Sequence, residues 1–153
     1  MTIIGIISDT HGSLSQSALN AFVGVDRILH AGDIGSFQVI ETLHQIAPTS
    51  AVRGNTDNGK WCQHLPVYDI IEISGISFCL LHDLQTIDLD PASAGVQFVI
   101  HGHTHQAENL RRDNVFFFNP GSASVRRHGG PLSVGRIKIE KYGIISDIIT
   151  IDN

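Results

Sequence analysis

Five short apolar segments, each followed at once by a loop rich in aspartate, histidine, asparagine or glycine, are the feature of this sequence that most restricts its fold. The loops are Ser8-Asp9-Thr10-His11-Gly12, His30-Ala31-Gly32-Asp33, Gly54-Asn55-Thr56-Asp57, His82-Asp83 and His101-Gly102-His103-Thr104-His105. Apolar runs bounded in this way are typical of buried strands, and glycines permit tight turns and close backbone approach. In layered α/β proteins, sites form beyond the carboxyl ends of the strands. If the five strands share one sheet, their loops emerge along one edge and can converge.

The order of the predicted elements indicates an α/β fold in a single domain, residues 1–153. Strands are expected at residues 3–7, 27–29, 51–53, 67–73, 76–81, 98–100, 115–118, 133–140 and 144–151, and helices at 14–23 and 37–46. Alternation of strand and helix in the first half predicts parallel pairing, and Ser74-Gly75 predicts a hairpin turn. The late strands, with few helices between them, suggest a second and largely antiparallel sheet. We therefore expect two stacked sheets flanked by helices.

Charge and cysteine content exclude several classes of protein. A formal net charge of −5, without a basic stripe, argues against a general nucleic-acid-binding protein. Cys62 and Cys79 are too few for a disulfide framework. The apolar stretch at residues 3–7 is too short for a signal peptide or a membrane span. We expect a cytoplasmic protein with free thiols, for which association into a homo-oligomer stays open.

The loops carry the donor atoms of a metal site. Asp9 and His11 are two residues apart, as are His103 and His105, so in extended backbone each pair points to one side. The full candidate set is Asp9, His11, Asp33, Asn55, His82, His103 and His105. Nitrogen and oxygen donors without thiolate suit manganese, iron, zinc, nickel or cobalt. Seven ligands exceed the four of one tetrahedral ion, so we expect two ions sharing a carboxylate, with Asp33 as the natural bridge.

A pair of divalent cations favours a phosphate substrate. Two cations, two carboxylates and a shared hydroxide leave residual positive charge, which suits a phosphate oxyanion, and paired metals activate a hydroxide for in-line attack. We expect hydrolysis of a small-molecule phosphate ester, with Asp33, Asn55 and His82 as catalytic residues. Substrate contacts are assigned to Asn55, Arg53 and Asp57.

Each residue taken alone also has a structural explanation. Asp9 could cap the helix that begins near residue 13 or 14, and Asn55 and Asp57 are common turn formers. His82 could be a core histidine whose nitrogens are satisfied, and His128 lies in a loop between arginine and glycine residues. The joint pattern, five such loops each behind a strand, favours the metal site.

These motifs resemble the calcineurin-like metallophosphoesterase family. The matching residues are the Asp-x-His of Asp9 and His11, Gly32-Asp33, Gly54-Asn55, His82, the Gly-His-x-His of Gly102 to His105, and the closing Asn119-Pro120-Gly121-Ser122. Within that family the chain is similar to the small stand-alone phosphodiesterases of bacteria and archaea. The resemblance implies a four-layer α/β/β/α sandwich and two divalent ions, commonly manganese or nickel. It implies Asp9, His11, Asp33 and His105 around one ion, and Asp33, Asn55, His82 and His103 around the other.

Three features depart from the family pattern. Thr56 stands where larger members have a histidine that protonates the leaving group, and Asp83 stands where glycine is usual. The stretch from residue 84 to 95 is short, which predicts a trimmed helix. Two alternatives remain: a protein-binding scaffold of the same fold, resembling the retromer subunit, and a metal-stabilised binding module without turnover.

Overall fold

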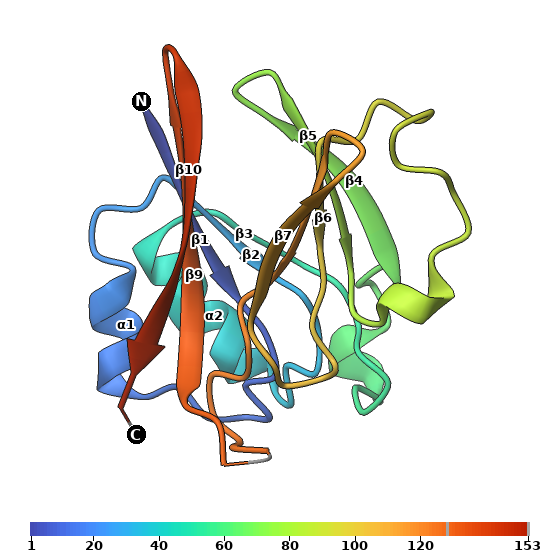
Figure 1. Ribbon diagram of the computed structural model, residues 1–153. Coiled ribbons are helices and arrows are strands. Elements are labelled where there is room, and N and C mark those ends of the chain that lie inside the picture. Colours follow the sequence, from blue (N-terminus) through green and yellow to red (C-terminus); the bar gives the residue numbers. More distant parts are fainter. Residues whose placement is uncertain (128, 153) are drawn as a thin grey trace.

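The first of two stacked sheets contains both the amino-terminal and the carboxyl-terminal strands. The computed structural model describes residues 1–127 and 129–152, so His128 lies outside the described residues (Figure 1). The strands run in the order β10-β9-β1-β2-β3. Their bounds are Thr2–Ile7 for β1, Arg27–His30 for β2, Thr49–Ala51 for β3, Leu132–Glu140 for β9 and Gly143–Ile151 for β10. The first three strands pair in parallel, and β9 and β10 join them antiparallel.

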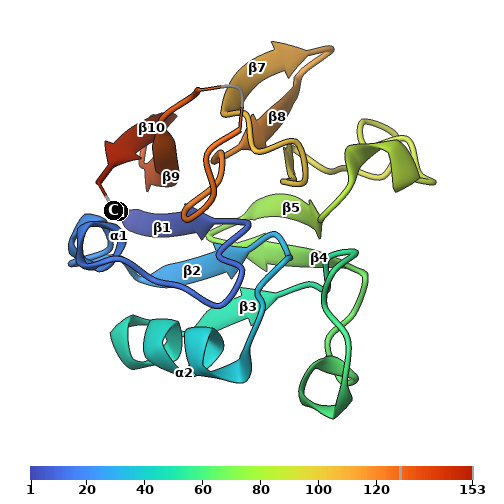
Figure 2. The same cartoon turned by 90° about the horizontal axis from the view of Figure 1, so that it is seen from below.

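The second sheet has the strand order β4-β5-β6-β8-β7. Its strands are β4 at Tyr68–Ile73, β5 at Ile76–Leu81, β6 at Phe98–Ile100, β7 at Glu108–Arg112 and β8 at Val115–Asn119. The central strands β5, β6 and β8 are parallel, while β4 and β7 pair antiparallel at the two edges. Figure 2 shows the two sheets as adjacent layers.

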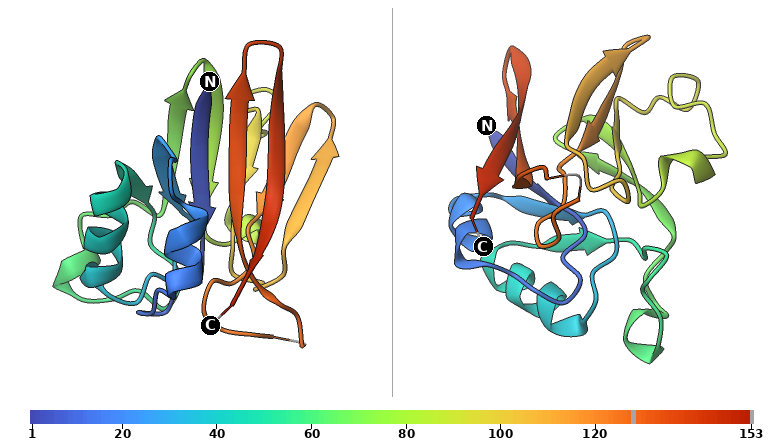
Figure 3. Two further views of the ribbon diagram at one scale, coloured as in Figure 1. Left: turned by 90° about the vertical axis from the view of Figure 1, so that its left-hand side faces the viewer. Right: turned by 60° about the horizontal axis from the view of Figure 1, so that its bottom comes forward.

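Two helices cover the outer face of the first sheet. Helix α1 spans Gln16–Ala21 and helix α2 spans Phe37–Ile46, and Figure 3 shows both on the side away from the second sheet. The α1 N-cap is Ser15, whose side chain accepts a hydrogen bond from the Ala18 amide. The capping explanation for Asp9 is therefore wrong, because another residue occupies that position.

The main core lies between the sheets. Ile4, Ile6 and Leu29 of the first sheet meet aromatic residues of the second, and all are fully buried. The rings of Phe78 and Phe98 stack with centroids 5.2 Å apart. Each such side chain contributes about 1.5–3 kcal/mol on burial, so this layer holds the two sheets in a fixed relation.

The outer face of the second sheet is covered by a loop with one short helical turn. The 3-10 helix η2, Leu84–Thr86, and the segment that follows it lie over Cys79, Leu81 and Val99. A second 3-10 turn, η1, spans Lys60–Cys62. The two-sheet sandwich is confirmed, and the predicted trimming of the helix at 84–95 is seen as the single short turn η2. No helix within residues 1–127 and 129–152 is long and apolar enough to cross a membrane.

Three details of the predicted topology are wrong. The late strands β9 and β10 belong to the first sheet, and the second sheet is mixed, because apolar alternation does not reveal which edge a strand pairs with. The strand β7 was not expected, since its sequence, ENLRR, lies at an exposed edge and lacks apolar alternation. The third strand was expected at residues 51–53, but β3 spans Thr49–Ala51.

Candidate metal centre

The five loops converge at one end of the sandwich, although their strands do not share a sheet. Three follow β1, β2 and β3 of the first sheet, and two follow β5 and β6 of the second. The condition that all five strands share one sheet is therefore not met. The loops still meet because the two stacked sheets bring the carboxyl ends of these strands to the same side, the lower side in Figure 1. The amide of Gly102 donates to the His82 carbonyl at 3.0 Å, which joins the two loops of the second sheet.

The first group of side chains surrounds one carboxylate oxygen of Asp9. Asp9 Oδ1 lies 3.2 Å from His105 Nε2 and 3.8 Å from His11 Nε2. The Nε2 atoms of the two histidines are 3.4 Å apart. Three donor atoms from two loops thus face one point.

The second group is centred on Asp33 and His82. Asp33 Oδ2 lies 3.3 Å from His82 Nε2 and 3.8 Å from His11 Nε2. Asp9 Oδ1 lies 3.9 Å from the same His82 nitrogen. Two overlapping groups, Asp9 with His11 and His105, and Asp9 with Asp33 and His82, have the spacing of potential metal ligands. Asp9 and Asp33 both face histidines of the two groups, so the bridging role of Asp33 stays a prediction.

Asn55 and His103 stand at the edge of the second group. Asn55 Oδ1 lies 3.2 Å from His103 Nδ1, and the rings of His103 and His82 have centroids 5.2 Å apart. All seven predicted side chains therefore lie together. Their role as metal ligands remains a prediction.

Five of the seven candidates have left-handed backbone conformations. The φ angles are 57° at Asp9, 46° at His11, 55° at Asp33, 74° at His103 and 61° at His105. Non-glycine residues adopt such angles at a cost of about 1–3 kcal/mol each, and these residues cluster at functional sites. These strained backbone conformations direct the five side chains toward the cluster.

Two glycines allow the loops to approach the carboxylates. A Cβ atom on Gly54 would collide with the Asp33 backbone amide and its Oδ1 atom. One on Gly102 would collide with Ser8 Oγ and approach Asp9 Oδ2 to 2.8 Å. The expected close backbone approach is confirmed at both positions.

The buried charges set the protonation of the cluster. Burial by itself would raise the pKa of Asp33, but the His82 imidazole, whose Nε2 lies 3.3 Å from Asp33 Oδ2, and the hydrogen bond from the Thr56 amide hold that pKa well below its ordinary value. Burial by itself would lower the pKa of His82, yet the adjacent carboxylates of Asp33 and Asp9 raise it. Binding of a metal ion at His82 Nε2 would require that nitrogen to be deprotonated.

Several supporting residues escaped prediction from the sequence. His30 is buried and its Nδ1 accepts from the Gly32 amide at 3.1 Å, while Nε2 lies 2.9 Å from Thr10 Oγ1. Burial lowers the pKa of His30 to about 3. Asn119 Nδ2 donates to the Gly102 carbonyl at 3.1 Å. The only sequence signals for these two residues were their places within the loop motifs.

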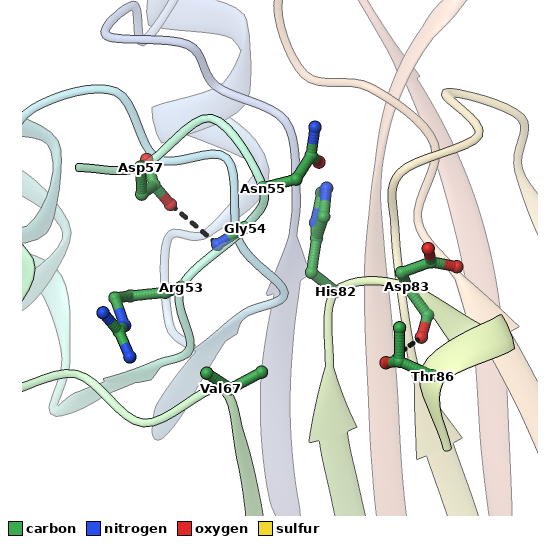
Figure 4. Close-up of a pocket in the computed structure, with 8 residues that line it drawn as sticks. All are labelled: Arg53, Gly54, Asn55, Asp57, Val67, His82, Asp83 and Thr86. Carbon is green, nitrogen blue, oxygen red and sulfur yellow. Dashed lines mark hydrogen bonds between the residues drawn. The ribbon is translucent and has the colours of Figure 1, made fainter.

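A pocket of about 340 Å³ opens beside the second group (Figure 4). Asn55, His82 and Asp83 point to one side of it, while the Arg53 side chain points away from His82. The Asp57 carboxylate accepts from the backbone amides of Ile34, Gly35 and Gly54 at 3.1, 3.0 and 2.9 Å. Asp57 therefore links two of the loops, whatever contact it makes with substrate.

The donor set fits divalent metal ions. Asp9 Oδ1 and His82 Nε2 are buried and have no hydrogen-bond partner. Such groups cost free energy unless an ion or water compensates them. His82 Nδ1 is 2.8 Å from the Ala31 carbonyl, which orients the ring so that Nε2 faces the carboxylates.

Fold and site together define a two-sheet α/β protein with a cluster of histidine and carboxylate side chains, of the kind that could hold metal ions, at one end of its sandwich. Residues 1–142 match the calcineurin-like phosphoesterase superfamily domain, and the chain belongs to this family.

Two curated relatives align over most of the chain. The "probable metallophosphoesterase" of Methanothermobacter thermautotrophicus is 31% identical over 159 aligned positions, covering 96% of this chain and 91% of that protein. The phosphodiesterase YfcE of Escherichia coli is 28% identical and covers 91% and 89%.

Solved structures show the same fold. A novel archaeal phosphodiesterase has a TM-score of 0.78 at 25% identity, covering 97% of this chain and 100% of that one. Zinc-bound Vps29 from Entamoeba histolytica has a TM-score of 0.77 at 20% identity, covering 99% and 100%.

Proposed function

We propose that this phosphoesterase hydrolyses phosphodiesters with the help of two divalent metal ions. Manganese is the metal we favour, and nickel, iron, zinc and cobalt are alternatives. The observation that carries the proposal is the pair of buried, unpartnered donor atoms, Asp9 Oδ1 and His82 Nε2, inside a cluster of further nitrogen and oxygen donors.

The candidate side chains would divide between two ions, with Asp33 in both sets. One ion would be held by Asp9, His11, Asp33 and His105, and the other by Asp33, Asn55, His82 and His103. When bound, the two ions lower the pKa of a water nucleophile and neutralise charge on the phosphoryl oxygens.

The protein side chains prepare the site for an anionic substrate. The pKa of Asp33 is held well below its ordinary value by the adjacent His82 imidazole and by the hydrogen bond from the Thr56 amide, so Asp33 would join the two ligand sets as an anion. Asn55 and His82 both line the 340 Å³ pocket, and we place the phosphate group of the substrate there. We assign substrate contacts to Asn55, with Arg53 and Asp57 around it.

A diester is favoured over a monoester by the charge at the pocket. The Asp83 carboxylate lines the pocket beside His82, and it opposes the second negative charge of a phosphate monoester. Two relatives named as phosphodiesterases, YfcE and the archaeal protein, support the same assignment.

The test compares hydrolysis of bis(p-nitrophenyl) phosphate and p-nitrophenyl phosphate by the wild-type protein, with and without Mn²⁺. We expect Mn²⁺-stimulated cleavage of the diester, and a loss of at least about 100-fold in Asp33→Asn. Faster cleavage of the monoester would contradict the diester assignment. Metal-dependent cleavage of neither compound would reject the enzymatic function.

The second candidate is a protein-binding scaffold of the same fold. Its support is the likeness to Vps29 and an exposed apolar strip on the edge strand β4, where Tyr68 and Ile70 are 53% and 47% exposed. The presence of donor-type residues at all seven ligand positions favours the enzyme. Absence of activity in the assay above, together with retained metal binding, would favour the scaffold or a binding module without turnover.

We also place the protein in the cytoplasm, on the ground that Cys62 and Cys79 are both free and buried. A small phosphate ester is its proposed partner, and its oligomeric state is to be measured in solution.

A further inference from the structure

The carboxylate of Asp83 lies beside the imidazole of His103, facing the nitrogen that Asn55 does not contact. Asp83 Oδ2 is 4.0 Å from His103 Nε2, whereas Asn55 Oδ1 is 3.2 Å from His103 Nδ1. The two ring nitrogens of His103 therefore have different surroundings. One faces the candidate ligands, and the other faces a carboxylate outside that set.

The turn that follows Asp83 fixes the direction of its carboxylate. Asp83 Oδ1 accepts from the Gln85 amide at 3.0 Å, as the cap of the 3-10 helix η2. The Asp83 carbonyl accepts from Thr86 Oγ1 at 2.7 Å and from the Thr86 amide at 3.0 Å (Figure 4). Because Oδ1 is used by the cap, Oδ2 is the oxygen left to face His103.

The position of one proton decides whether His103 can bind a metal ion. A neutral imidazole has one N–H group and one nitrogen with a free lone pair, and only the latter binds metal. If Nδ1 joins Asn55 Oδ1 as a ligand, the proton must be on Nε2. In His82 the Ala31 carbonyl has the corresponding role. It lies 2.8 Å from Nδ1, so it favours a proton on Nδ1 and leaves Nε2 free to bind.

We propose that Asp83 is a positioning residue for the second metal ion. Its Oδ2 atom accepts the Nε2–H of His103 and so stabilises the tautomer in which Nδ1 is free to bind. Asp83 Oδ2 and His103 Nε2 are 4.0 Å apart, so this hydrogen bond requires a small rotation of one side chain; both side chains are partly exposed, 41% for His103 and 32% for Asp83. Carboxylates that orient metal-binding histidines in this way typically contribute about 10–100-fold to metal affinity. The inference rests on the proposed function, because it requires metal at the cluster.

The first experiment measures metal binding and not catalysis. The purified full-length protein is freed of metal with a chelator and titrated with Mn²⁺ by calorimetry, for the wild type, Asp83→Asn and Asp88→Asn. Asparagine keeps the cap on η2 but weakens the acceptor for His103. The control removes the same charge at an exposed position five residues further along the same loop.

We expect Asp83→Asn to weaken one of two Mn²⁺-binding steps by about tenfold and to leave the other unchanged, while Asp88→Asn behaves as wild type. No loss, or an equal loss at both steps, would overturn the proposal, because an equal loss indicates only a long-range effect of charge. Binding of no metal by the wild type would reject both this inference and the proposed function. Two-step binding with an unaffected Asp83→Asn would reject this inference alone.

The second experiment reads the tautomer directly. Nitrogen-15 NMR of the zinc-loaded protein assigns the protonated nitrogen of each imidazole, with His103→Gln used to identify the His103 signals. We expect an Nε2–H tautomer for His103 in the wild type, with its proton signal shifted upfield in Asp83→Asn as the hydrogen bond weakens. A protonated Nδ1 in the zinc-loaded wild type would rule out the arrangement.

Discussion

Asp9 and His105 come from opposite sheets of the sandwich, and Asp9 Oδ1 lies 3.2 Å from His105 Nε2. Asp9 follows the first strand and His105 follows β6. His11, whose Nε2 lies 3.4 Å from His105 Nε2, is 94 positions away from it in the sequence. The second oxygen of Asp9 is fixed from two sides, by Ser8 Oγ at 2.7 Å and by the His103 amide at 3.2 Å. The carboxylate is thus held with one oxygen open to the cluster.

Replacement of this carboxylate is expected to abolish stabilisation by metal. A ligand at 100 times its dissociation constant stabilises the folded state by about 2.7 kcal/mol, so Mn²⁺ should raise the free energy of unfolding of the wild type by about that amount. Asp9→Asn should lose nearly all of the increase, because the amide cannot replace the anionic oxygen. Urea unfolding with and without Mn²⁺ measures both values. Asp147→Asn, on the exposed face of β10, is the control and should respond to Mn²⁺ as the wild type does.

A methyl group at Gly54 is expected to disrupt the site. Its Cβ would occupy the place of the Asp33 amide and carboxylate, and overpacking of this kind costs about 1–3 kcal/mol. Gly54→Ala should therefore lower the free energy of unfolding by about 2 kcal/mol and reduce phosphodiesterase activity at least about 100-fold. Gly143→Ala meets no atom within 4 Å and should change neither quantity. Retained activity in Gly54→Ala would contradict this prediction, because it would show that the Asp33 loop can shift without loss of phosphodiesterase activity.

Acid should destabilise the metal-free protein through His30. Burial lowers the pKa of His30 from 6.5 to about 3 in the folded state, so between these values the unfolded chain binds a proton that the folded chain does not. Stability from this group is therefore present at neutral pH and is lost as the pH falls below the unfolded value. Between pH 7.5 and pH 5 the loss should be about 2 kcal/mol.

The measurement for His30 is urea unfolding of the chelated protein at both pH values. His30→Asn keeps an acceptor for the Gly32 amide but cannot take up the proton. The difference between pH 7.5 and pH 5 should shrink by about 2 kcal/mol in the variant. Equal pH dependence in the two proteins would show that His30 does not stay neutral in the fold.

The residue after Asn55 should decide which leaving groups are accepted. Thr56 is exposed, and its hydroxyl is too weak an acid to protonate a leaving group at neutral pH. Esters with a phenolate leaving group should therefore be cleaved much faster than alkyl esters, which need an acid. Thr56→His should raise the rate on an alkyl diester roughly tenfold or more, because its backbone amide still contacts Asp33 while the imidazole supplies a proton. Thr56→Ser is the matched control. Equal rates of the wild type on aryl and alkyl diesters would contradict this account.

Much of the candidate site could be predicted because its signal is local. Strand runs such as Phe98–Ile100 were predicted with the bounds that the structure has, and the residue types behind them predicted a metal-type cluster. Supporting contacts were less accessible. Asn119 donates a hydrogen bond to the carbonyl of Gly102, which is 17 positions earlier in the sequence. No periodicity in the sequence indicates such a pair.

Short-range patterns in the sequence were enough to select the candidate donor residues, since they place Asp, His and Asn at the ends of buried strands. How those strand ends meet depends on the tertiary packing. The loops come from two sheets and not from one, and the sheets are placed by packing of Ile4, Leu29 and Phe78 in the interior. Tertiary packing also decided the orientation of each donor, as with Asp83 and His103, because hydrogen bonds from other loops and left-handed backbone angles aim these side chains. Such contacts form only when distant segments pack, so the linear pattern identifies the donors but not their geometry.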